Sequence, residues 1–188
     1  MNLPNKLTVA RIVLTPFFLA ALLIDFNGHW LCACILFIIS SLTDMLDGKI
    51  ARKNNLITDF GKFLDPLADK TLVVSCCIGF VALDLCSPVV AIIVVIREFL
   101  ISAVRMLAAT SGRVIAANIW GKIKTAYTMV AMAASMFSMW LAEDCGLFAT
   151  ESVMTICNVA MWIAAFITAM SGITYLVQNK DIITSLEA

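Results

Sequence analysis

The sequence predicts an all-α membrane protein in which six transmembrane helices form one compact bundle. Of its 188 residues, 62% are hydrophobic and only 14% are charged, and the mean hydropathy is +0.98. Soluble domains carry about 25% charged residues, so this composition excludes an ordinary soluble class. Six apolar segments also approach the roughly 20 residues that a helix needs to cross a bilayer. Positive charges, finally, lie in alternate connections between those segments.

The six apolar segments follow one another with short gaps, so we expect a single membrane domain over residues 1–188 and no soluble domain. The first segment is the least apolar, because it contains Arg11 and Pro16. The expected spans are Leu7–Ile24, Trp30–Leu46, Leu64–Leu85, Pro88–Ala109, Ile123–Leu141 and Val153–Val177.

Lysine and arginine predict the orientation of these spans, since cytoplasmic connections are enriched in them. They occur at the N-terminus, between spans two and three, between spans four and five, and after span six. The alternate connections contain neither residue type. We therefore expect both termini to face the cytoplasm, together with the connection between spans two and three.

A few residues mark helix boundaries. Ser87 followed by Pro88 is typical of a helix start, with a capping side chain and then proline at the first position. Thr58 is a candidate cap for the third helix, which would place Pro66 inside that helix as a kink. A third helix that begins only at Asp65 is the alternative that the sequence leaves open.

Four aspartates form two pairs near the cytoplasmic ends of spans two and three. Asp44 and Asp47 are three residues apart, and Asp65 and Asp69 are four apart, so each pair projects from one face of its helix. Carboxylates packed this closely need cations to stay ionised, and hard oxygen ligands suit Mg²⁺, Mn²⁺ or Ca²⁺. A structural ion-pair network at the membrane surface is the alternative, which the regular spacing disfavours.

Small residues and one arginine accompany the aspartates. Gly48 and Ala51 share the helical face of Asp44 and would let a ligand approach the backbone closely, while Arg52 could take a phosphate. Gly61 has a similar place beside the second pair. Two metals between the helices could then clamp a pyrophosphate for an in-line displacement, with a carboxylate as general base toward an alcohol.

This stretch resembles the signature of the CDP-alcohol phosphatidyltransferase family at every position. The resemblance implies a six-helix, usually dimeric membrane protein with a cytoplasmic site, in which an alcohol displaces CMP from a CDP-linked lipid. It implies that the four aspartates hold two Mg²⁺ or Mn²⁺ ions and that Asp69 also accepts a proton. It further implies a nucleotide site formed by Gly48, Ala51, Arg52, Thr58 and Gly61, with Asn5 and Thr8 beside it. The pattern itself is Asp44-x2-Asp47-Gly48-x2-Ala51-Arg52-x8-Gly61-x3-Asp65-x3-Asp69.

Three further stretches are similar to one branch of that family, the phosphatidylglycerophosphate synthases. They are NLPNKLTVARIVLTPFF at Asn2–Phe18, REFLISAVR at Arg97–Arg105 and NIWGKIKTAYTM at Asn118–Met129. This similarity implies CDP-diacylglycerol and glycerol 3-phosphate as substrates, the bacterial cytoplasmic membrane as location, and no nucleic-acid partner.

An acceptor that carries its own phosphate requires cations besides the metals, and spans four and five supply them. The candidates are Arg97, Arg105, Lys122 and Lys124. A structural interhelical role is the alternative for Arg97, and a solvated, orientation-setting role is the alternative for Lys124. Glu98 follows Arg97 directly, and adjacent helix positions point about 100° apart. We therefore do not expect the two to pair with each other and expect each to meet another helix.

Other functions predict different patterns. The same chemistry with inositol phosphate, serine or phosphatidylglycerol as acceptor would keep the aspartates, although neutral serine gives Arg105 and Lys122 no purpose. A divalent-cation transporter would place acids near mid-span on several helices, whereas these four cluster at the ends of two. A non-catalytic scaffold gives no reason for the spacing.

Overall fold

The computed structural model describes residues 3–53, 59–110 and 119–180, and within them it leaves out the side chains of residues 3–6, 44–53, 59–67, 69 and 110. These described ranges contain six α-helices and no strand, which confirms the predicted all-α class. The helices are α1 (Leu3–Leu23), α2 (His29–Lys53), α3 (Asp59–Ala82), α4 (Pro88–Thr110), α5 (Ile119–Glu143) and α6 (Thr150–Gln178).

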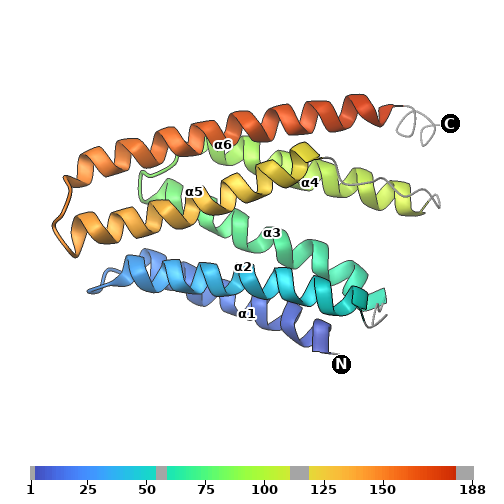
Figure 1. Cartoon of the computed structure of the whole chain (residues 1–188), viewed down its shortest axis with the longest axis horizontal. Helices are drawn as coiled ribbons and strands as arrows, with labels where there is room; N and C mark the ends of the chain where they lie inside the picture. Colours follow the sequence, from blue (N-terminus) through green and yellow to red (C-terminus); the bar gives the residue numbers. More distant parts are fainter. Residues whose placement is uncertain (1–2, 54–58, 111–118, 181–188) are drawn as a thin grey trace.

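The helices pack as one bundle (Figure 1). Helix α1 lies against α2 and α3, helix α5 lies against α2 and α6, and helix α4 lies against α3 and α6. The start of α1, the end of α2, the start of α3 and the end of α6 all lie at one end of the molecule, on the right in Figure 1. The turns between α1 and α2 and between α5 and α6 lie at the other end. The ends of α1, α2 and α3 that carry lysine and arginine thus lie together at one end, the basic end of the bundle.

Several predicted boundaries can be compared with the structure. Helix α4 begins at Pro88, and the backbone N–H of Val89 donates to Ser87 Oγ at 3.4 Å, as expected of a capped start. Helix α3 begins at Asp59 and includes Pro66, so the alternative start at Asp65 is wrong. Its proposed cap, Thr58, lies outside the described residues.

The third predicted span is too long at its far end. We expected it to reach Leu85, but α3 ends at Ala82, and Asp84 adopts a positive φ of 57° that no helix continues through. The backbone N–H groups of Leu85 and Cys86 both return to the carbonyl of Phe80. Apolar residues in this turn, such as the fully buried Leu85, extend the hydrophobic run beyond the helix.

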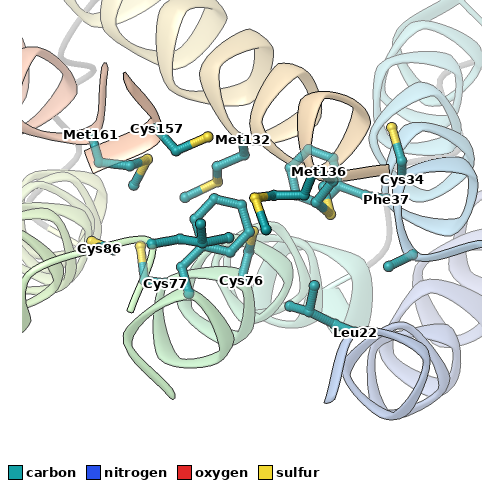
Figure 2. Close-up of a cluster of buried hydrophobic side chains, with 14 of the residues drawn as sticks. Leu22, Cys34, Phe37, Cys76, Cys77, Cys86, Met132, Met136, Cys157 and Met161 are labelled. Carbon is teal, nitrogen blue, oxygen red and sulfur yellow. The ribbon is translucent and has the colours of Figure 1, made fainter. Parts of the chain in front are cut away.

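The core is rich in sulfur (Figure 2). Cys76 and Cys77 of α3 pack with Met132 and Met136 of α5, and all four are fully buried. Methionine fills irregular gaps, and buried free cysteine behaves as a small apolar residue. All seven cysteines are free thiols. Burial raises the pKa of the Cys86 thiol, in the turn before α4, to about 11, so this thiol stays protonated and unreactive at neutral pH.

The outer surface is strongly apolar. Two helices, α5 and α6, are long and apolar enough to cross a membrane, and shorter apolar stretches occupy Leu7–Leu23, His29–Thr43 and Lys70–Ala82 of the described chain. Large apolar side chains such as Val130 and Phe166 are 67% and 69% exposed. Contiguous apolar surface of this kind marks contact with lipid or with another protein.

Candidate functional site

The backbone brings the two aspartate pairs to similar depths at the basic end of the bundle. Asp47 lies six residues before the end of α2, and Asp65 lies six residues after the start of α3. With a rise of 1.5 Å per residue, both are about 9 Å from their helix ends, and Asp44 and Asp69 are about 14 Å from them. Counted along its own helix, Asp47 is therefore as far from the helix end as Asp65, and Asp44 is nearly as far as Asp69.

The side chains of these aspartates lie outside the described part of the structure, so their coordination is not seen. Among the side chains that the structure does describe, no three His, Cys, Asp or Glu residues form a metal-binding group. The donor chemistry of the motif, four carboxylates at two matched depths, fits hard divalent cations such as Mg²⁺ or Mn²⁺.

Helix α1 adds buried polar residues beside these pairs, since it packs against both α2 and α3. Thr8 is 1% exposed and Arg11 is 2% exposed. A buried guanidinium requires anions around it, because the cost of desolvating an uncompensated charge is several kcal/mol. Arg11 was not among the predicted site residues, and its burial on a helix that packs against both α2 and α3 makes it a further candidate. The side chain of Asn5 is not described.

A cluster of charged side chains joins α4, α5 and α6. Glu98 of α4 accepts a hydrogen bond from the Lys124 ammonium of α5, and Arg97 Nη1 lies 3.4 Å from the same carboxylate oxygen. The Lys124 side chain is only 3% exposed, which excludes the solvated role considered for it. Arg97 and Glu98 also contact each other, although adjacent positions diverge, because the long arginine side chain turns back to the carboxylate.

Arg97 is held on its other side by α6. Its Nη2 donates to Ser171 Oγ at 2.9 Å. A Cβ on Gly172 would lie 3.2 Å from Arg97 Cγ, and a Cβ on Gly121 would lie 3.7 Å from Nη2. Glycines on α5 and α6 thus leave the space that the arginine occupies. The expectation that Arg97 and Glu98 each meet another helix is confirmed, whereas the expectation that they do not pair with each other is wrong.

Arg105 forms a second contact between α4 and α6, two turns further along. Its Nε donates to the Tyr175 hydroxyl at 3.3 Å, and its guanidinium carbon lies 5.5 Å from the centre of that ring. Arg105 and Lys122 are both exposed, in contrast to Arg97 and Lys124. The structure therefore divides the four predicted cations into two that are held inside the bundle and two that remain accessible.

Comparison with known proteins identifies the family. The family model described as CDP-alcohol phosphatidyltransferase matches residues 1–170, which include both aspartate pairs and all four cations. The chain belongs to the CDP-alcohol phosphatidyltransferase family. It is therefore a phosphatidyltransferase, and its signature residues lie on α2 and α3.

Three relatives of this phosphatidyltransferase carry the same name, CDP-diacylglycerol–glycerol-3-phosphate 3-phosphatidyltransferase. The relative from Bacillus subtilis (strain 168) is 40% identical, over 96% of this chain and 96% of its own length. The relative from Haemophilus influenzae is 36% identical over 93% of this chain and 91% of its own. The relative from Rickettsia felis is 34% identical over 93% of each.

Sequence reasoning missed the α6 side of the site. Thr168, Ser171 and Tyr175 are all buried in the phosphatidyltransferase, and Ser171 and Tyr175 hold the two arginines. Their spacing of three and four residues puts them on one face of an otherwise apolar helix. That polar stripe is the signal that could have found them. Gly48, Ala51, Arg52 and Gly61 lie on the described helices without described side chains, while Thr58 lies outside the described residues.

Proposed function

We propose that this phosphatidyltransferase transfers the phosphatidyl group of CDP-diacylglycerol to the primary hydroxyl of glycerol 3-phosphate, giving phosphatidylglycerophosphate and CMP. Relatives named for this reaction align with nearly the whole chain. In the structure, the observation that carries the choice of acceptor is the cation cluster, where Arg97 and Lys124 share the carboxylate of Glu98 and, among the described side chains, Arg105 contacts the neutral Tyr175. A surplus of positive charge suits an alcohol that bears its own phosphate.

The six helices are proposed to cross the bacterial cytoplasmic membrane, with the basic end in the cytoplasm. Two observations support this arrangement: the ends of α1, α2 and α3 that carry lysine and arginine lie at one end of the bundle, and the flanks expose large apolar side chains. Glycerol 3-phosphate and CMP are water-soluble, so a site at the cytoplasmic end gives both direct access. A homodimer within the membrane is part of the same proposal.

The proposed reaction is a displacement at phosphorus in which CMP is the leaving group and an aspartate is the base. The hydroxyl oxygen of glycerol 3-phosphate attacks the phosphorus that bears diacylglycerol, the bond from that phosphorus to the CMP oxygen breaks, and Asp69 takes the hydroxyl proton. Two Mg²⁺ or Mn²⁺ ions would neutralise the charge of the pyrophosphate, and the residues that would hold them are Asp44, Asp47, Asp65 and Asp69. The aspartates at matched depths on α2 and α3 support this assignment.

Two groups of residues are proposed to bind the two substrates. The CDP-lipid is assigned to Asn5, Thr8, Gly48, Ala51, Arg52, Thr58 and Gly61. The acceptor phosphate is assigned to Arg105 and Lys122, the two accessible cations, with Arg97 and Lys124 behind them. Holding both substrates at one place converts a bimolecular displacement into an effectively intramolecular one.

The experiment that tests this function offers one alcohol at a time to the purified protein with CDP-diacylglycerol and Mg²⁺, and measures CMP release. We expect turnover with glycerol 3-phosphate and only background with serine, inositol phosphate or phosphatidylglycerol. Asp69→Asn serves as the inactive control. Equal or greater turnover with another alcohol would overturn the assignment of the acceptor.

A further inference from the structure

We propose that Glu98 is a positioning residue of the acceptor site: its carboxylate holds Lys124 and Arg97 in the places from which they act on the phosphate of the incoming alcohol. This inference rests on the proposed function, because it assumes that the acceptor carries a phosphate. Glu98 is the only acidic residue of α4, in the middle of the helix, where an ionised side chain is costly unless it is paired.

The contacts of Glu98 are concentrated on one oxygen. Oε1 accepts the hydrogen bond from Lys124 and lies 3.4 Å from Arg97 Nη1. The Glu98 side chain is 15% exposed, and that of Lys124 is 3% exposed, so water replaces neither partner. Hydrogen bonds between charged groups in such a setting are stronger than those at the surface and fix the geometry of both partners.

The Lys124–Glu98 pair is not a by-product of tight helix packing. In the described chain α4 packs mainly against α3 and α6, and α5 mainly against α2 and α6. Two long side chains therefore reach across between α4 and α5. Without Glu98, nothing described on α4 would direct the Lys124 ammonium toward the side where Arg97 and Arg105 lie.

Lys124 is also within electrostatic range of α3, first of Cys77 and then of Lys70. A cation that Glu98 holds in one place can bind the phosphate of the acceptor there. In the proposed mechanism, this limits where the hydroxyl of the same molecule can reach, which is why the position of Lys124 matters to the reaction.

A purely structural role makes a different prediction. A buried ion pair can often be replaced by apolar residues of similar volume without loss of stability. If Glu98 and Lys124 only joined two helices, the double variant E98M/K124M would keep normal kinetics. If they position the acceptor, the same variant folds but binds glycerol 3-phosphate poorly.

The test measures KM for each substrate, kcat and Tm for E98Q, E98D and E98M/K124M, using the full-length protein. We expect E98Q and E98M/K124M to raise KM for glycerol 3-phosphate about tenfold, the effect of losing one charged hydrogen bond. KM for CDP-diacylglycerol should stay within about twofold of the wild type, because the change does not touch that substrate. E98D keeps the charge and should fall between E98Q and the wild type.

Glu143→Gln is the matched control. Glu143 accepts a hydrogen bond from Trp30 Nε1 at 2.6 Å and so also joins two helices by a carboxylate, at the opposite end of the bundle. This variant should leave both KM values unchanged. Parallel changes in both KM values, or an unchanged KM for glycerol 3-phosphate in the double variant, would overturn the role of Glu98.

Arg105→Ala separates failure of this inference from failure of the proposed function. If Arg105→Ala raises KM for glycerol 3-phosphate while the Glu98 variants do not, the acceptor site stands and the role of Glu98 is wrong. If neither variant affects that KM, the acceptor site itself is misplaced. If E98Q does not accumulate as folded protein, E98D and the double variant still decide the question.

Discussion

Arg105 is the accessible cation whose surroundings give the sharpest expectation for acceptor binding. Replacing it by alanine removes a guanidinium that Tyr175 holds by one hydrogen bond and by its ring face, at 3.3 Å and 5.5 Å. A hydrogen bond to a charged group contributes about 1.5–3 kcal/mol, which corresponds to roughly 10- to 100-fold in binding. We therefore expect Arg105→Ala to raise KM for glycerol 3-phosphate by that factor.

The assay follows CMP release while one substrate is varied at saturation of the other. Because Arg105 is exposed and lies on α4 rather than on the helices that carry the aspartate motif, KM for CDP-diacylglycerol should change by less than about twofold. Tyr175→Phe is the graded control: it removes the 3.3 Å hydrogen bond and keeps the ring, so the expected rise is only a few-fold. An equal rise in both KM values after Arg105→Ala would remove Arg105 from the acceptor site.

Three further predictions concern the base, the metals and the packing. Asp69→Asn should lower kcat at least 100-fold with normal folding, as measured by CMP release and Tm; near-normal turnover would disprove the assignment of the base. A chelator should abolish turnover, and excess Mg²⁺ or Mn²⁺ should restore it; activity that survives chelation would contradict the metal assignment. Gly79→Ala should lower the stability by about 1–3 kcal/mol, seen as a lower Tm, because its Cβ would lie 2.5 Å from Cδ2 of the fully buried Leu22; an unchanged Tm would contradict this packing.

The sequence predicted the helices well because each one is a long apolar run between clear boundaries. Ser87 and Pro88 show how local chemistry fixes such a boundary without any tertiary contact. The third span was misjudged at Leu85 because hydrophobicity reports burial rather than helicity, and the turn after α3 is buried too. The aspartate motif could be assigned to two helix ends, since its spacing depends only on helical periodicity.

The acceptor side of the site could not be assigned in the same way. The burial of Lys124 depends on Glu98, which is 26 residues away and on a helix that α5 does not pack closely against. Ser171 and Tyr175 contact Arg97 and Arg105 only because α4 and α6 run side by side. Contacts of this kind follow from how helices pair, and no local pattern in one helix encodes its partner.

The bundle divides the proposed reaction between two groups of helices. Helices α1, α2 and α3 carry the aspartate motif and the buried Arg11. Helices α4 and α5 carry the cations proposed for the acceptor, and α6 contacts two of them. The two groups meet where α5 packs on α2 and where α4 packs on α3. In the proposed mechanism the lipid-linked pyrophosphate is held by the first group and the acceptor phosphate by the second. Their relative position then decides whether the hydroxyl reaches the phosphorus, and we propose that the Lys124–Glu98 pair, which joins α5 to α4, fixes the place of the acceptor phosphate.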